Sequence, residues 1–354
     1  GRGTDMFVRN AWYVAAWSSE VVAGRTFPRQ VLGERVVMFR DSRGAIAVVE
    51  DRCCHRGLPL SLGQVVGDTI VCGYHGISYN AAGKCVAIPG QQHVPPAMRV
   101  RSYPVVEQDE LIWVWMGANE QADRGLVASY PYHNDKARWP HRTHWQRLGC
   151  AYTLVIDNLL DLTHLAFVHR RTIGGDPDAH TSARFSVEAT AQGVRLMRWL
   201  LDSNPPPTYV NAVGFKGRVD RWMEFEFIAP GAVLQFTGAL DVGRGAYEHG
   251  NREGGFALRI FHGITPETQD TCHYFWSGCH GYRQDEPAVT AEIYSALACT
   301  FAEDASILEA QHASIRARPA PLFSTTHDRA RVIAERKLRQ LLAAEAQVPA
   351  ADHC

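Results

Sequence analysis

Two short segments of the chain each carry one cysteine and one histidine at close spacing. Cys53 and His55 form the first pair, and Cys72 and His75 form the second. Glycines in both segments loosen the loops and let backbone amides approach a bound group. Thiolate and imidazole groups are the usual protein ligands of zinc and of iron. The spacing therefore predicts two neighbouring loops that share one metal centre.

The pairing of ligand types favours one kind of centre. In a Rieske [2Fe-2S] cluster two cysteines hold one iron and two histidines hold the other, whereas a structural zinc site usually takes a cysteine pair and then a histidine pair at other spacings. One cysteine and one histidine from each loop match the cluster. A mixed zinc site, or a chance spacing in a chain with 16 histidines, is the alternative. We expect the adjacent Cys54 to be packed or idle.

A second group of ligand-type side chains interrupts an apolar segment that we predict to be helical over about 154–167. It contains Asp157, Asn158, Asp161, His164 and His169. Buried carboxylates and imidazoles need partners, which suggests a metal. On one helix Asp161 and His164 share a face, but His164 and His169 lie about 140° apart. The two histidines converge only if the helix widens into a π-bulge or ends between them.

An iron site of two histidines and one carboxylate needs an acid that can come from elsewhere in the chain. Asp304 falls on the apolar stripe of a predicted helix, about 20° from Leu297, where a carboxylate is costly unless it is bound. A partly exposed helix acid is the alternative. Asp157 competes for the third position but lies on a different face from His164. We expect Glu303 and Glu309 to point into solvent.

The elements that must hold these residues suggest two domains. Short β-rich runs with hairpin signals at 35–50 and 102–116 occupy residues 6–117, and 118–140 is a polar connection. Residues 141–346 begin with the helical segment, continue as strands over about 186–276 and end in helices over about 286–315 and 326–346. We expect 347–354 to be a flexible tail. The pattern predicts an α+β protein with antiparallel strands.

Composition limits the partners. Among 354 residues, 36 Lys and Arg balance 37 Asp and Glu, so no strong field favours nucleic acid or an anionic membrane. No apolar run is long enough to cross a membrane, and the N-terminus lacks the profile of a signal peptide. The 9 cysteines are an odd number in a long chain, which argues against a disulfide framework. We expect a cytoplasmic protein with reduced thiols.

With these residues in place, the sequence resembles the oxygenase components of Rieske non-haem iron oxygenases. Within them it is most similar to the branch of vanillate O-demethylase, toluenesulfonate methyl-monooxygenase and dicamba O-demethylase. The resemblance runs from residues 10–15 to residues 301–304 and 309–311. It implies an N-terminal Rieske [2Fe-2S] β domain followed by a helix-grip (START-like) catalytic domain with an antiparallel sheet. Cys54 departs from it, because many members have proline there.

The resemblance also implies a role for each candidate residue. Cys53, His55, Cys72 and His75 match the cluster ligands, and His164, His169 and Asp304 match the ligands of a mononuclear Fe(II). Asp161 matches the acid that joins the two centres between subunits, and Asn158 matches a position near the iron.

The same family implies a homotrimer in which the cluster of one subunit reduces the iron of the next. Electrons come from a separate NAD(P)H-dependent reductase with flavin and an iron-sulfur cluster, because no dinucleotide-binding Gly-x-Gly-x-x-Gly is apparent in this chain. With O₂, such a system hydroxylates a methyl or methoxy carbon of a small acidic aromatic compound. A hydroxylated methoxy carbon is released as formaldehyde.

His262 lies on the apolar side of a predicted strand, 256–262, in a segment that resembles the family segment whose histidine binds the anionic group of the substrate. A hydrogen-bonded structural histidine is the alternative. Two rival functions stay open. A ring cis-dihydroxylating dioxygenase would use the same centres, and a Rieske electron-transfer protein would need only the first domain.

Overall fold

The computed structural model describes residues 7–169 and 183–347, and the chain divides into two compact units. Gly1–Ser129 and Thr265–Gln269 form the first unit, and Tyr130–Ile264 and Asp270–Cys354 form the second. The first division falls inside the predicted connection, 118–140. The return of Thr265–Gln269 to the first unit was not predicted from the sequence. Most of the predicted tail, 348–354, lies outside the described residues.

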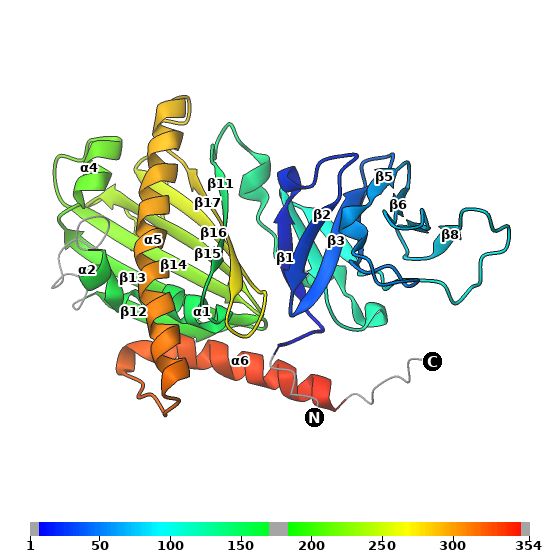
Figure 1. The fold of residues 1–354 in the computed structure, drawn as a ribbon. Coiled ribbons are helices and arrows are strands. Elements are labelled where there is room, and N and C mark those ends of the chain that lie inside the picture. Colours follow the sequence, from blue (N-terminus) through cyan, green and yellow to red (C-terminus); the bar gives the residue numbers. More distant parts are fainter. Residues whose placement is uncertain (1–6, 170–182, 348–354) are drawn as a thin grey trace. The chain divides into compact units, whose positions relative to one another are not determined.

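From residue 7 onward, the first unit consists of three small antiparallel sheets (Figure 1). Both predicted hairpins are confirmed: β3 (Glu34–Arg40) pairs with β4 (Ile46–Glu50), and β9 (Val105–Gln108) pairs with β10 (Leu111–Trp115). The sheet orders are β1-β10-β9, β2-β3-β4 and β5-β6-β7-β8. The other strands are β1 (Trp12–Trp17), β2 (Phe27–Val31), β5 (Gln64–Val66), β6 (Thr69–Val71), β7 (Ser78–Asn80) and β8 (Cys85–Ala87).

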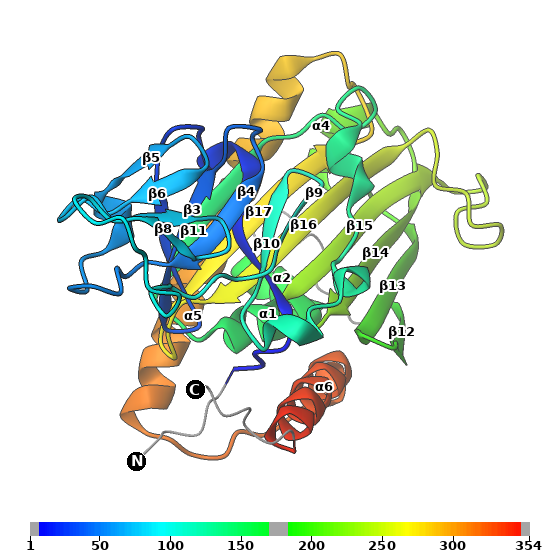
Figure 2. The same cartoon turned by 90° about the vertical axis from the view of Figure 1, so that its right-hand side faces the viewer.

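The second unit is built on one seven-stranded sheet in the order β11-β17-β16-β15-β14-β13-β12 (Figure 2). Its strands are β11 (Thr143–Leu148), β12 (Arg184–Ala189), β13 (Gly193–Ser203), β14 (Val219–Ile228), β15 (Ala232–Asp241), β16 (Phe256–Pro266) and β17 (Cys272–His280). The strand-rich region is therefore confirmed. The short helix α4 (Pro207–Val213), which interrupts it, was not predicted.

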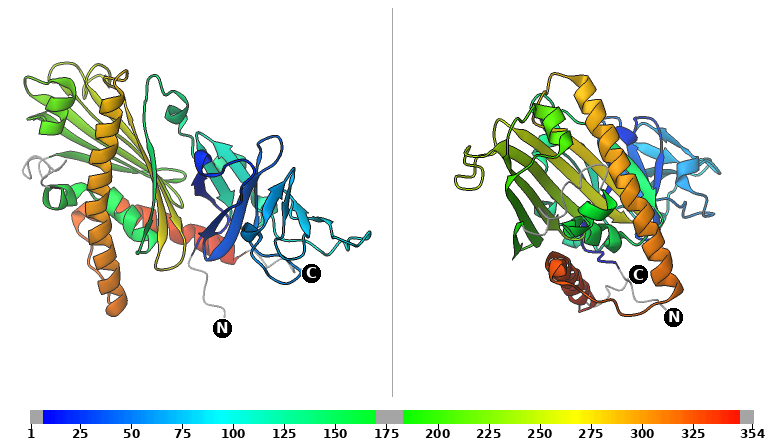
Figure 3. Two further views of the ribbon diagram at one scale, coloured as in Figure 1. Left: turned by 45° about the horizontal axis from the view of Figure 1, so that its top comes forward. Right: turned by 90° about the vertical axis from the view of Figure 1, so that its left-hand side faces the viewer.

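The two predicted C-terminal helices are also confirmed, as α5 (Pro287–Ala317) and α6 (Arg329–Ala346). The long α5 runs across one face of the sheet, as Figure 3 shows. Its buried positions include Leu297, Phe301 and Asp304, so the expectation that Asp304 lies on the buried side is confirmed. Within the described residues, no helix is both long and apolar enough to cross a membrane.

The predicted single helix over 154–167 is wrong in one respect. The chain forms α1 (Tyr152–Leu160), a 3-10 turn (Leu162–His164) and α2 (Leu165–Val168). Between α1 and the turn, Asp161 is extended with φ −117° and ψ 104°, and its carboxylate accepts hydrogen bonds from Thr163 N and Oγ1 at 2.9 and 2.7 Å. This cap starts a new turn, so Asp161 and His164 do not share one helical face. Helix α2 ends at Val168, between His164 and His169. This is one of the two conditions under which the two histidines were expected to converge.

Candidate metal centres

The two cysteine-histidine segments form loops of the same conformation. In the first loop Gly57 N donates to the Cys53 carbonyl at 3.0 Å, and in the second Gly76 N donates to the Cys72 carbonyl at 3.0 Å. The two glycines have φ of +74° and +72°, a region that favours glycine. Each loop therefore turns back directly after its histidine.

These turns separate the ligand types. Cys53 and Cys72 are each 2% exposed, whereas His55 and His75 are exposed, with ring centroids 4.7 Å apart. Two thiols on the inner side and two imidazoles on the outer side are the ligand set of a Rieske cluster, whose two irons take different ligands. The residues fit the cluster.

Tyr79 is a contact of this centre that sequence reasoning missed. Its hydroxyl lies 3.1 Å from Sγ of Cys53 and 3.2 Å from Sγ of Cys54. Burial raises the pKa of Tyr79 above its usual range, so the hydroxyl keeps the proton that it can donate to a thiolate sulfur. Cys54 is exposed but not idle, because its backbone N–H also donates to Tyr79. Alternation along β7 gave no sign of this role.

The second centre brings together His164, His169 and Asp304. Oδ1 of Asp304 lies 3.5 Å from Nε2 of His164 and 3.0 Å from Nε2 of His169. Burial would raise the pKa of Asp304, but hydrogen bonds from both histidines lower it to about 2. An ionised carboxylate and two imidazole nitrogens that converge on it are the ligand set of non-haem Fe(II) sites.

The opposite nitrogen of each imidazole is also held. Nδ1 of His164 lies 2.6 Å from the backbone carbonyl oxygen of Asp161, and Nδ1 of His169 lies 2.6 Å from Oε2 of Glu303. Acceptors of this kind fix the orientation of metal-binding histidines. Glu303 therefore does not point into solvent as expected. Sequence reasoning missed it because its partner lies more than a hundred residues away in the chain.

Two neighbours on α1 differ in their relation to this centre. Nδ2 of Asn158 donates to Oδ1 of Asp304 at 3.2 Å and lies 3.5 Å from Nε2 of His164. Asp157 lies instead near Arg331 of α6, and burial raises its pKa to about 7. The chain therefore brings Asp304, and not Asp157, to the two histidines.

A cavity of about 330 Å³ opens onto the second centre, between the sheet and the helices α4 and α5. A cavity of this size suits single-ring and two-ring compounds. His164, His169 and Asp304 lie in its lining, and most of the remaining wall is apolar. The middle of the sheet contributes Met223, Thr237 and Leu258, and α4 contributes Tyr209 and Ala212.

His262 is fully buried and is not among the residues that line this cavity. Its Nδ1 bonds the Tyr274 hydroxyl at 2.7 Å, and its Nε2 bonds Oε1 of Gln235 at 2.9 Å. Burial lowers its pKa to about 3, so the ring is neutral near pH 7. Gln235 does line the cavity, and so does Phe301, whose ring centroid lies 5.6 Å from that of His262, so His262 can reach a bound molecule only through such neighbours.

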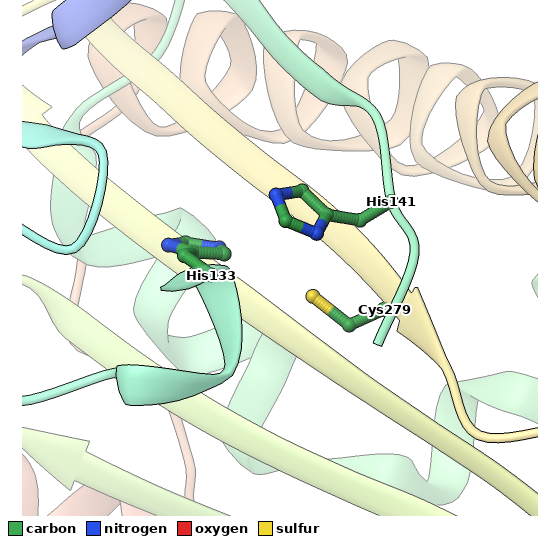
Figure 4. A group of neighbouring side chains, drawn as sticks. All are labelled: His133, His141 and Cys279. Atoms are coloured by element: carbon green, nitrogen blue, oxygen red, sulfur yellow. The ribbon is translucent and has the colours of Figure 1, made fainter. Parts of the chain in front are cut away.

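A third group of ligand-type side chains, His133, His141 and Cys279, was not predicted from the sequence. Figure 4 shows the Cys279 thiol directed toward the space between the two rings. Nε2 of His133 bonds Oγ of Ser277 at 2.6 Å, and Nδ1 of His141 bonds the Trp139 carbonyl at 2.9 Å. The first of these bonds attaches the segment before β11 to β17.

Comparison with known proteins agrees with both centres. Residues 11–104 match the Rieske [2Fe-2S] domain, and residues 148–344 match the vanillate O-demethylase oxygenase C-terminal domain. The chain is 37% identical to a toluene-4-sulfonate monooxygenase iron-sulfur subunit of Comamonas testosteroni, over 86% of this chain and 88% of that one. It is 35% identical to a vanillate O-demethylase oxygenase subunit of a Pseudomonas species, over 96% of each chain.

Among solved structures, dicamba monooxygenase bound to 3,6-dichlorosalicylic acid superposes with a TM-score of 0.89 at 30% identity. The match covers 97% of this chain and 99% of that one. Another structure of dicamba monooxygenase contains non-haem iron.

Proposed function

Because this chain belongs to the Rieske non-haem iron oxygenases with a vanillate O-demethylase type of catalytic domain, we propose that it hydroxylates a methyl or methoxy carbon of an acidic aromatic compound. It is an oxidoreductase of the monooxygenase and O-demethylase type, with a Rieske [2Fe-2S] cluster and a non-haem iron as cofactors. The observation that carries the reaction is the largely apolar cavity that ends at His164, His169 and Asp304.

The chain supplies the ligands and their positions. Cys53, His55, Cys72 and His75 would hold the cluster, and His164, His169 and Asp304 would hold the iron. When bound, the iron activates O₂ with electrons that the cluster delivers. The Asp161 carbonyl and the Glu303 carboxylate keep the two imidazoles turned toward Asp304. The Asn158 amide donates to Asp304 and forms part of the cavity wall next to His164.

The electrons come from a partner, because relatives of this chain are oxygenase components of systems with several components. We take that partner to be an NAD(P)H-dependent reductase with flavin and an iron-sulfur cluster. Transfer then runs from the cluster of one subunit to the iron of its neighbour in a homotrimer. Asp161 is suited to join them, since its Oδ1 is bonded to Thr163 while Oδ2 has no hydrogen bond within the described residues.

A product screen tests the reaction. The purified oxygenase, a reductase, NADH and O₂ are incubated with methoxy and methyl aromatic acids. Formaldehyde with the corresponding phenol, or a benzylic alcohol, is the expected product. A cis-dihydrodiol as the main product would replace the proposal with ring dihydroxylation.

Iron content tests the remaining rival function. The proposed oxygenase holds about three irons per chain, two in the cluster and one at the second centre. An electron-transfer protein would hold about two and would form no oxygenated product. Reduction should also produce the electron paramagnetic resonance signal of a Rieske cluster.

A further inference from the structure

A buried arginine lies at one end of the cavity. Arg221 of β14 is 4% exposed and lines the cavity, and its Nε has no hydrogen-bond partner within the described residues. Its guanidinium carbon stands 4.9 Å from the ring centroid of Tyr209 and also interacts with the Tyr209 hydroxyl. These contacts hold the group in place but do not neutralise it.

No carboxylate in the described part of the chain forms an ion pair with Arg221. The nearby Arg198, also 4% exposed, has Asp161 as an opposing charge and adds repulsion to Arg221. Glu292 also lines the cavity, but it lies near Arg283. A guanidinium taken out of water without an anion is costly, and the cost falls when an anion binds. The charge of Arg221 is therefore available to a bound molecule.

The position of Arg221 along the cavity follows from the strand register. Arg221 pairs with Ala239, which pairs with Phe256, whereas Phe225 pairs with Gln235 four paired rows farther along the strand. At 3.3–3.4 Å per residue, four residues separate the two rows by about 13 Å. Gln235 bonds His262, which lies close enough to feel the charge of Asp304. Arg221 thus belongs to the end of the cavity remote from the iron ligands.

Positions along α5 also place the Arg221 end and the metal end at opposite ends of the cavity. Val289, near the start of α5, packs with Tyr209 and Phe256 in one cluster, and Asp304 follows 15 residues later. At 1.5 Å per residue this is about 22 Å of helix. The arginine end and the metal end of the cavity are therefore joined by a wall of Met223, Thr237 and Leu258, with Ala296 and Thr300 from α5.

We propose that Arg221 binds the carboxylate or sulfonate of the substrate, with that group at the opposite end of the molecule from the carbon that is oxidised. This proposal rests on the proposed function and makes its substrate class narrower. A guanidinium donates two parallel hydrogen bonds to two oxygens of either anion, and the apolar middle of the cavity takes an aromatic ring. Para-substituted and longer aromatic acids fit this spacing better than ortho-substituted ones.

Binding to the purified holoenzyme, measured by calorimetry without reductant, tests the site apart from turnover. The probes are 4-methoxybenzoate, 4-methylbenzenesulfonate, 6-methoxy-2-naphthoate, the ortho isomer 2-methoxybenzoate and the neutral 4-methoxybenzamide. We expect Arg221→Gln to weaken binding of the para and two-ring acids about 10- to 100-fold, as loss of a charged hydrogen bond does, and to change benzamide binding less than about 2-fold.

Arg259→Gln is the matched control. Arg259 lies on β16 beside the lining residue Leu258, so it faces the other side of the sheet, where its guanidinium carbon stands 4.0 Å from the Tyr132 ring. Acid binding should survive in this variant. If Arg221→Gln does not fold, Arg221→Met takes its place. If neither variant accumulates, the parent protein itself tests the proposal. It must bind 4-methoxybenzoate at least 10-fold more tightly than 4-methoxybenzamide.

Three results would overturn the proposal: parent-like acid binding by Arg221→Gln, equal loss of the acid and the amide, or acid binding that depends on His262 and not on Arg221. The product screen separates this failure from failure of the reaction. If only neutral methoxy aromatics were oxidised, the anion site at Arg221 would be rejected and the proposed oxygenase reaction would stand. If acids bound in an Arg221-dependent way but no oxidised product formed, the anion site would stand and the proposed reaction would be rejected.

Discussion

The carboxylate of Glu303 lies 2.6 Å from Nδ1 of His169, on the ring edge opposite the one that faces Asp304. Two adjacent acids of α5 thus hold one imidazole from both sides. Glu303 favours the tautomer whose Nε2 lone pair is available to a metal, and its negative charge makes that nitrogen more basic.

Replacing Glu303 by alanine should therefore weaken iron binding about 10- to 100-fold at the second centre while the cluster stays intact. Iron is titrated into the stripped enzyme, with the Rieske absorption as the internal reference. Glu309→Ala is the control, since Glu309 lies on the same helix but accepts from Gly149 N at 2.8 Å. Equal iron affinity in Glu303→Ala and Glu309→Ala would show that Glu303 does not support the site.

Asp161→Asn should slow electron transfer between the centres. Asparagine keeps the oxygen that caps the turn at Thr163, so the fold and the His164 contact with the backbone carbonyl should survive, but the charge is lost. The pre-reduced cluster is mixed with substrate and O₂, and its oxidation is followed in a single turnover. We expect a decrease of at least 10-fold. A parent-like rate would reject the coupling role.

Tyr79→Phe should lower the reduction potential of the cluster. The hydroxyl that lies 3.1 Å from Sγ of Cys53 stabilises the extra electron of the reduced state, so its removal should cost on the order of 50 mV. Redox titration monitored by electron paramagnetic resonance gives the value. Tyr103→Phe serves as control, because Tyr103 bonds Glu34 and not a cluster ligand. Identical potentials in all three proteins would contradict the assignment.

Asp157 gives a pH dependence of stability. Burial raises its pKa in the folded protein to about 7 from 3.8, so the folded state holds a proton that the unfolded state releases between about pH 4 and 7. The contribution of Asp157 to stability is complete below pH 4 and is lost as pH rises through 7. Asp157→Asn should then be more stable than the parent at pH 8, by on the order of 1–3 kcal/mol.

Thermal unfolding of Asp157→Asn and of the parent, at a series of pH values from 4 to 8, measures this difference. The two melting temperatures should converge toward pH 4. A constant difference across the series would mean that Asp157 is ionised throughout in the folded protein.

Local spacing was enough to predict which four residues meet at the first centre, because each loop holds its cysteine and histidine within four residues. It was also enough for the buried face of Asp304, which follows from helical period. It failed at Asp161, where a side-chain cap on Thr163 outweighs the apolar pattern of a continuous helix. It could not find Glu303 or Arg221, since each acquires its role only from contacts between distant segments.

The length of α5 limits how the substrate range of this enzyme can change by mutation. Asp304 lies past the middle of the helix, and the residues that meet the far end of the cavity, such as Val289 and Ile293, lie three to four turns earlier. Exchanging side chains in those early turns reshapes the binding space and leaves Asp304 in register with His164 and His169. Inserting or deleting one residue between them would rotate the two regions by about 100° relative to each other. Point substitution, and not change of length, is the route by which this helix can diversify.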